Sequence, residues 1–273
     1  MTALERIVFA VLVLAVAGGG YWWWKSQQSP APLPPPAAVT TPAAPPPVPE
    51  AAAEGTIQHP IEQAPVGAET EPPKPLPKLA DSDAAATDAL ASVSPQQKAP
   101  DFLVPKTLVR HIVATVDNLP RDKVSMNLWP VKPTGGAFLV ANSRDGKVIA
   151  PANSARYTPY VRWMESVDAK KVASVYVRFY PLFQEAYKDL GYPKGYFNDR
   201  LITVIDHLLA TPEVSGALRL EQPKVLYEFA DPQLKATSAG QQILLRMGNE
   251  NALKVKAKLR ELRKEVARQA PKG

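Results

Sequence analysis

The chain has 273 residues, with 32 lysines and arginines against 26 aspartates and glutamates, and a formal net charge of +6 at pH 7. It contains no cysteine, which excludes a disulfide framework and a lipobox cysteine. Its histidines are His59, His111 and His207. They form no H-E-x-x-H motif, and there is no Gly-rich phosphate loop, so the sequence predicts no metal site and no cofactor.

Residues 7–24 form an uncharged, mostly apolar stretch that begins with Ile7 and ends with Trp24. As a helix it would be roughly 27 Å long, enough to cross a thin hydrocarbon core. The aromatic rings that follow, and then a lysine, are typical of a membrane–water interface. The predicted interface residues are Tyr21, Trp22, Trp23, Trp24 and Lys25. The sequence therefore predicts a transmembrane anchor.

The orientation of this anchor rests on a weak charge bias. The tail, residues 1–6, carries Arg6 against Glu5, and Lys25 lies on the other side of the apolar stretch. A short tail before a large remainder favours an uncleaved signal anchor with residues 1–6 in the cytoplasm and the rest in the periplasm. The alternative is a cleaved signal peptide, because Ala15-Val16-Ala17 matches an A-x-A site.

Residues 25–80 are rich in proline and alanine, and 16 of the 30 prolines of the chain fall between Pro30 and Pro77. Such a segment has too little apolar surface to offset the entropy of ordering, and proline favours extended conformations. We expect a disordered stalk that serves as a spacer. The alternative is that a partner recognises a specific Pro-rich motif in it.

Residues 81–270 are predicted to form one mainly helical domain with a small β-hairpin or meander insertion. Apolar spacing, caps and prolines predict helices at 81–93, 106–119, 159–168, 169–190, 196–210, 238–247 and 249–268. Pro181 is expected to remove one backbone donor from the helix at 169–190. Short strands are expected between Val124 and Pro151, with turns at 134–136 and at Asp145-Gly146, whereas 218–229 is ambiguous between a strand pair and irregular structure.

Three ordered runs of this domain resemble one bacterial family. The runs are FLVPKTLVRHIVATVDNLP, YVRFYPLFQEAYKDLGYPKGYFNDRLITVIDHLLATP and QPKVLYEFADPQLKATSAGQQILLRMG. Together they are similar to the DUF3014 family, a domain of unknown function, over roughly residues 80–268. The resemblance implies a proteobacterial envelope protein with an N-terminal anchor and a Pro/Ala-rich stalk. It supplies no activity and no catalytic residue.

The candidate binding surface is the part of the chain between Arg178 and Arg200, where aromatic side chains alternate with polar ones. Its candidate residues are Arg178, Tyr180, Tyr192, Tyr196, Asn198 and Arg200. An arginine would contact an anionic or carbonyl group of a ligand and a tyrosine would stack on it, as in a glycan or peptide groove. The alternative is core packing, because several aromatic residues of this stretch fall on the apolar stripe of their helix.

A catalytic function has less support. Glu165-Ser166 resembles the Glu-Ser pair of lytic transglycosylases, but the sequence that should follow it is missing. A carboxylate near Asp199 is the other candidate acid of a cell-wall hydrolase. No G-x-S-x-G turn is present. A non-enzymatic binding or scaffold protein of the inner membrane is therefore the preferred interpretation, with an envelope protein or peptidoglycan component as partner and no nucleic acid.

The last predicted helix is strongly basic and carries a short apolar seam. From Leu253 to Gly273 there are eight basic and two acidic residues. The seam residues Val255, Leu259, Leu262 and Val266 follow a spacing of four, three and four. Residues 253–268 are therefore expected to pack on the domain with their charges in water. The alternatives are self-association, an acidic partner or an anionic membrane surface.

Overall fold

The computed structural model describes residues 57–61 and 75–268, all within one compact unit, Ala51–Gly273. The predicted tail, anchor and interface residues, 1–25, lie outside the described residues, as does most of the predicted stalk. Among the described residues, no helix is both long and apolar enough to cross a membrane. Residues 57–61 and 75–80 belong to the range predicted as stalk, and in the structure they lie against the helical domain.

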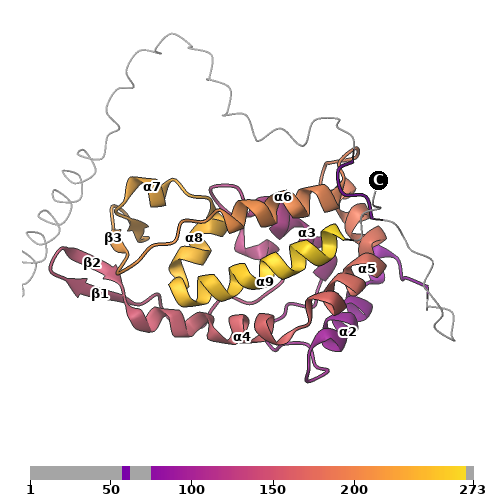
Figure 1. Ribbon diagram of the computed structural model, residues 1–273, viewed down its shortest axis with the longest axis horizontal. Coiled ribbons are helices and arrows are strands. Elements are labelled where there is room, and N and C mark those ends of the chain that lie inside the picture. The colour runs from indigo at the N-terminus through magenta and orange to yellow at the C-terminus, as the bar shows by residue number, and fades with distance from the viewer. Residues whose placement is uncertain (1–56, 62–74, 269–273) are drawn as a thin grey trace, which may run out of the picture. The chain divides into compact units, whose positions relative to one another are not determined.

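The domain is mainly helical, as the sequence predicts, and its helices and strands are shown in Figure 1. The helices are α2 (Asp83–Val93), α3 (Leu108–Asn118), α4 (Thr158–Ser166), α5 (Ala169–Asp189), α6 (Phe197–Leu209), α7 (Pro232–Lys235), α8 (Ala239–Arg246) and α9 (Asn249–Ala267). Short 3-10 helices lie at Leu79–Asp81, Met126–Leu128 and Pro151–Tyr157. The long helix α9 packs against α4, α5 and α6.

Helix α5 shows how the sequence sets an element. The Asp168 side chain accepts a hydrogen bond from the Lys171 N–H, which caps the first turn. Tyr176, Phe179 and Leu182 are buried, in agreement with the predicted apolar stripe. Pro181 lies inside the helix, which continues to Asp189. The burial of the stripe therefore outweighs the loss of one backbone donor.

The prediction for Val124–Pro151 was only partly right. Strands β1 (Val140–Ser143) and β2 (Gly146–Ile149) do form the expected hairpin. The first half of the segment is not a hairpin, because prolines at 130 and 133 have no N–H to donate to a ladder. It pairs instead with the chain before α3, where the Val104 N–H donates to the Pro130 carbonyl at 2.8 Å.

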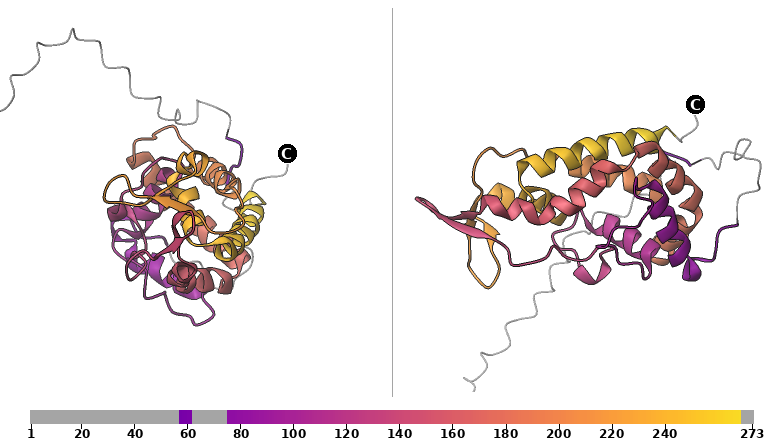
Figure 2. Two further views of the ribbon diagram at one scale, coloured as in Figure 1. Left: turned by 90° about the vertical axis from the view of Figure 1, so that its left-hand side faces the viewer. Right: turned by 90° about the horizontal axis from the view of Figure 1, so that it is seen from below.

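The ambiguous segment supplies the other two strands. Strands β3 (Arg219–Glu221) and β4 (Glu228–Phe229) extend the hairpin into an antiparallel sheet of order β1-β2-β3-β4. This sheet lies at the end of the domain away from α2 and α5, and the β1–β2 hairpin projects beyond the helices (Figure 2). It has its own small core around Leu220, Phe229, Leu234 and Leu245.

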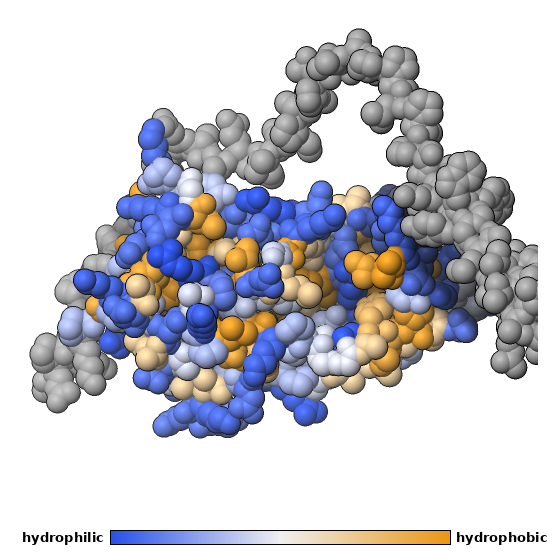
Figure 3. Space-filling model, turned by 180° about the vertical axis from the view of Figure 1, so that it is seen from behind, coloured by the Kyte–Doolittle hydropathy of each residue, from blue (hydrophilic) through white to orange (hydrophobic). Residues whose placement is uncertain are grey.

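Two further apolar clusters hold the helices together. One joins α2, α3, α5 and the start of α6, and the other joins α4, α6, α8 and α9. Three of the four seam residues of α9, Val255, Leu259 and Val266, contact these clusters, so they pack within the domain. On the face shown in Figure 3, hydrophobic side chains form separate patches between hydrophilic ones.

Candidate functional site

The start of α6 is held rigidly by α5. The amide of Gln184 donates to the Gly195 carbonyl at 2.7 Å and accepts from the Phe197 N–H at 2.9 Å. Phe197 is fully buried in the helical core. A Cβ at Gly195 would lie 2.8 Å from the Tyr187 ring, so glycine permits the close approach of the two segments. The three residues Tyr196, Asn198 and Asp199 are therefore presented on a fixed frame.

Asp199 binds two successive main-chain N–H groups of a distant segment. Its Oδ2 accepts from Gln58 N–H at 3.0 Å, and its Oδ1 accepts from His59 N–H at 2.7 Å. The same geometry recurs within the fold, where the Asp83 carboxylate accepts from the N–H groups of Thr107 and Leu108. A charged acceptor makes such bonds stronger than neutral ones.

Asn198 and Tyr196 complete the binding of this segment. The Asn198 amide donates to the His59 carbonyl at 2.8 Å, and the Tyr196 hydroxyl accepts from the Ile61 N–H at 2.6 Å. Asn198 is 0% exposed, and the Tyr176 hydroxyl donates to its Oδ1 at 3.0 Å. That buried contact fixes which side of the amide faces the segment. We name Tyr196, Asn198 and Asp199 the α6 site.

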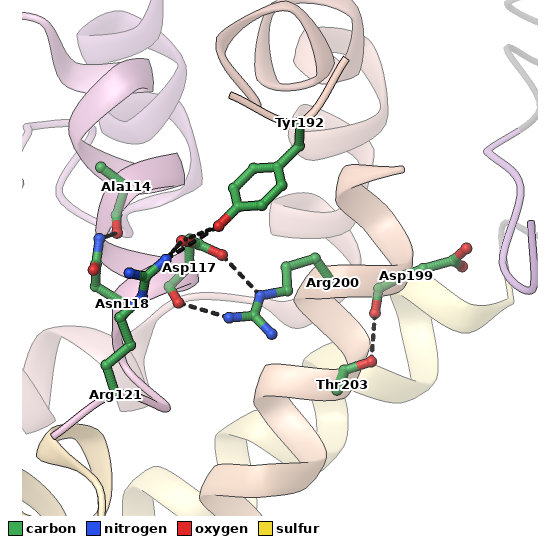
Figure 4. A network of polar contacts seen from close by, with 8 residues as sticks. All are labelled: Ala114, Asp117, Asn118, Arg121, Tyr192, Asp199, Arg200 and Thr203. Atoms are coloured by element: carbon green, nitrogen blue, oxygen red, sulfur yellow. Dashed lines mark hydrogen bonds and ion pairs between the residues drawn. The ribbon is translucent and has the colours of Figure 1, made fainter. Parts of the chain in front are cut away.

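A second polar cluster lies on the other side of the same helix turn. The carboxylate of Asp117, on α3, is 2% exposed and accepts from Arg121 Nη2 at 2.8 Å, Arg200 Nε at 3.0 Å and Tyr192 Oη at 3.1 Å. Arg200 also donates to the Asp117 carbonyl at 2.7 Å. Figure 4 shows Arg200 turned towards Asp117 and Asp199 turned away from it. We name these residues the Asp117 cluster.

The chemistry of the Asp117 cluster is structural. Burial raises the pKa of Tyr192, and the adjacent Asp117 carboxylate raises it further, so the phenol stays protonated and donates. Tyr192 also stacks on Tyr187, with 4.6 Å between ring centroids. Two guanidinium groups and a phenol surround the carboxylate, which is 2% exposed, so little of it is accessible to a ligand.

Residues 108–263 match the family described as "Protein of unknown function (DUF3014)", over more than half of the chain. The chain belongs to the DUF3014 family. No curated protein and no solved structure matches it. The family membership that the sequence predicts is thus confirmed. The function of this DUF3014 domain has to be argued from its own residues.

The structure divides the six candidate residues among different roles. Tyr196 and Asn198 bind the segment 57–61, whereas Tyr192 and Arg200 belong to the Asp117 cluster. Tyr180 is buried and donates to Gln184, and burial raises its pKa. The Arg178 guanidinium lies 5.9 Å from the Phe179 ring centroid. The six therefore do not line one concave surface.

The residues that sequence reasoning missed carried a weak signal. The sequence predicts a candidate acid near Asp199 and no role for Asp117. The segment TIQHPIEQ interrupts the Pro/Ala composition of its surroundings, since it places two isoleucines and a histidine within five residues. That local change in composition was the available hint that 57–61 differs from a spacer.

A cavity lies in another part of the domain. It has a volume of about 820 Å³ and lies between α4, the start of α9 and the loop at 211–218. Glu165 lines it, together with the buried Lys256, which donates to the Thr211 carbonyl at 2.6 Å. Among all the described residues, 57–61 and 75–268, no group of His, Asp and Glu side chains could hold a metal ion.

Proposed function

We propose that this DUF3014 protein is a non-enzymatic binding protein of the bacterial cell envelope, anchored in the inner membrane by residues 7–24 with its domain in the periplasm. The domain binds short peptide segments of partner proteins at the α6 site. The apolar stretch with its aromatic and lysine border supports the anchor, and the Pro/Ala-rich residues support a tether. Neither feature alone indicates what is bound.

The observation that carries the binding function is the segment 57–61. It lies about 140 positions from Asp199 in the sequence, and four hydrogen bonds from three side chains hold its main chain. Main-chain hydrogen bonding is one of the ways in which proteins bind peptide segments, with selectivity supplied by side-chain contacts. A surface that binds such a segment of its own chain has the chemistry to bind one from a partner.

The experiment is photocrosslinking in cells, with a photoreactive residue at Thr203. Thr203 is exposed one turn after Asp199, and its hydroxyl bonds only the Asp199 carbonyl among the contacts of the described chain. We expect a defined envelope protein to be captured there. Leu226, between β3 and β4, is also exposed and is the control position, from which no capture is expected. A C-terminal phosphatase fusion should be active. An inactive fusion, or equal capture from both positions, would contradict the proposal.

The alternative is a cell-wall hydrolase that uses Glu165 as its acid. The observation in its favour is the position of Glu165 in the 820 Å³ cavity, beside Lys254. Lys254 pairs with Glu250 at 3.0 Å, and this pairing raises its pKa. We expect Glu165→Gln to leave envelope integrity and partner capture unchanged. A cell-wall defect from this single exposed substitution, with the fold intact, would favour the enzyme.

A further inference from the structure

The main-chain groups that the α6 site binds form a pattern. Counting Gln58 as the first position, the site binds the N–H groups of positions one, two and four and the carbonyl of position two. The third position, Pro60, has no N–H, and no contact of the site needs one there. Proline is therefore compatible with the third position, while at positions one, two and four it would remove a donor that the site uses.

Side-chain selectivity concentrates at the fourth position. Ile61 packs against the apolar cluster of α3, α5 and α6, whereas Gln58 is exposed and Ile57, before it, is 48% exposed. Ile61 is partly buried in this contact, and removing apolar surface from water favours binding. A partner segment therefore needs an aliphatic residue at position four, and polar residues are tolerated at position one.

The proline also prepares the segment for binding. A residue before proline is disfavoured in the helical region of backbone conformations, so Pro60 narrows the conformations open to His59, whose N–H and C=O bind Asp199 and Asn198. Less conformational freedom is then lost on docking. Proline at position three is thus favoured, although no hydrogen bond depends on it.

We propose that the partner presents a segment of the form X-X-Pro-aliphatic, bent at its first two positions as Gln58 and His59 are, to the α6 site, and that residues 58–61 occupy this site in cis and compete with it. The proposal rests on the proposed binding function. A tethered segment acts at a high effective concentration. The apparent affinity for a free peptide is then reduced in proportion to the fraction of sites that the segment leaves free. The stalk segment thereby sets the affinity threshold that a partner has to exceed.

The test measures binding of a labelled peptide to the detergent-solubilised full chain. The probe is a fluorescent nine-residue peptide with the sequence of residues 55–63, followed by fluorescence anisotropy. In one host the segment is disabled by Gln58→Pro and Ile61→Ser, and the other host is the unchanged chain. We expect the disabled host to bind the probe at least about tenfold more tightly, because its site is free. Equal binding by both hosts overturns the competition.

Variants of the probe and the host test the pattern. N-methylation of the fourth residue removes the N–H that Tyr196 accepts, and Ile61→Ala in the probe removes the apolar contact. Each should weaken binding at least about fivefold, while Pro60→Ala should weaken it less. Asp199→Asn in the disabled host should weaken binding at least about tenfold. Asp206→Asn is the matched control, because that carboxylate lies on the same helix and pairs with Arg263 instead.

The outcomes separate this inference from the function beneath it. If the N-methyl probe or the Asp199→Asn host binds as well as its reference, the pattern is wrong, even when crosslinking at Thr203 still captures a partner. If the probe binds as expected but no partner is captured in cells and the phosphatase fusion is inactive, the α6 site stands and the envelope function fails.

Discussion

Asp199 and Arg200 are neighbours on α6, yet they serve regions of opposite character. Arg200 joins a closed cluster in which Asp117, Arg121 and Tyr192 satisfy one another within the fold. Asp199 faces the other way and binds the main chain of a segment from outside the helical domain. Successive residues of a helix point about 100° apart, so one turn can serve a structural cluster and a binding surface at once.

The difference between the two regions lies in what each carboxylate faces. Asp117 is 2% exposed and meets two guanidinium groups, so its charge is balanced by side chains that are always present. Asp199 meets two neutral N–H groups of the adjacent residues Gln58 and His59, which lie in a bend of the chain. The partners of Asp117 are side chains of the helical domain, whereas the partners of Asp199 are main-chain groups of a segment that precedes this domain in the sequence.

Removing the carboxylate of the closed cluster should have the largest effect. Asp117→Ala leaves Arg121 and Arg200 facing each other without a counter-charge, so we expect the free energy of unfolding to fall by about 3–5 kcal/mol. Denaturant titration of the purified protein measures this. Asp122→Ala, which removes an exposed carboxylate nearby, is the control and should stay within about 0.5 kcal/mol. Equal stability of the two variants would show that the cluster is dispensable.

Arg200→Ala tests the same cluster from the helix that also carries Asp199. It leaves the buried Asp117 with one guanidinium and one phenol, and we expect a loss of about 2–3 kcal/mol. The sequence suggested a ligand contact for this residue, in which case stability would hardly change. Arg178→Ala is the comparison, since Arg178 is exposed on α5, and should cost less than about 1 kcal/mol. A thermal midpoint unchanged by Arg200→Ala would return Arg200 to the list of ligand-binding candidates.

Two tyrosines give a matched pair across the two regions. Tyr192→Phe removes a hydroxyl that donates to Asp117, and we expect it to cost about 1–2 kcal/mol of global stability. Tyr196→Phe removes the acceptor of the Ile61 N–H, and global stability should change by less than about 0.5 kcal/mol. Hydrogen exchange should then be faster at residues 58–61 in Tyr196→Phe alone. Faster exchange throughout the domain in both variants would mean that the two regions are one unit.

The smallest expected effect is a pH dependence from His207. Burial lowers the pKa of His207 below its ordinary value of 6.5, and the charge of Arg200 lowers it further. Near pH 6.5 the unfolded histidine therefore binds a proton that the folded one does not. Stability should fall as the pH drops through 6.5 towards the folded pKa, and level off below it.

The control for this effect is His207→Gln, in which the slope of stability against pH between about 7.5 and 5.5 should be smaller. Arg200→Ala should also reduce the slope, because it removes one of the two causes of the lowered pKa. If the slope is the same in all three proteins, the pH dependence comes from other groups.

The sequence by itself determined the helices and much of their packing. Tyr176, Phe179 and Tyr187 fall on one stripe of a 3.6-residue period, and all three are buried. Asp168 at a helix start and Gly191 after a helix end mark the limits of α5. These signals are local: each depends on residues within a few turns, so spacing and capping rules are enough to read them.

Only the tertiary structure decided which polar residues meet and which strands pair. The partner of Arg200 is 83 positions away, and the partners of Asp199 are about 140 away. Strand β2 pairs with β3 across a segment that contains three α-helices and one 3-10 helix. The side-chain types around Arg178–Arg200 predicted a single groove. The six candidate residues do not line one, because proximity in the sequence does not fix the direction in which each side chain points. The direction of a side chain depends on its position in the helix turn. Its partner depends on how distant segments fold together, here through the packing of α3, α5 and α6.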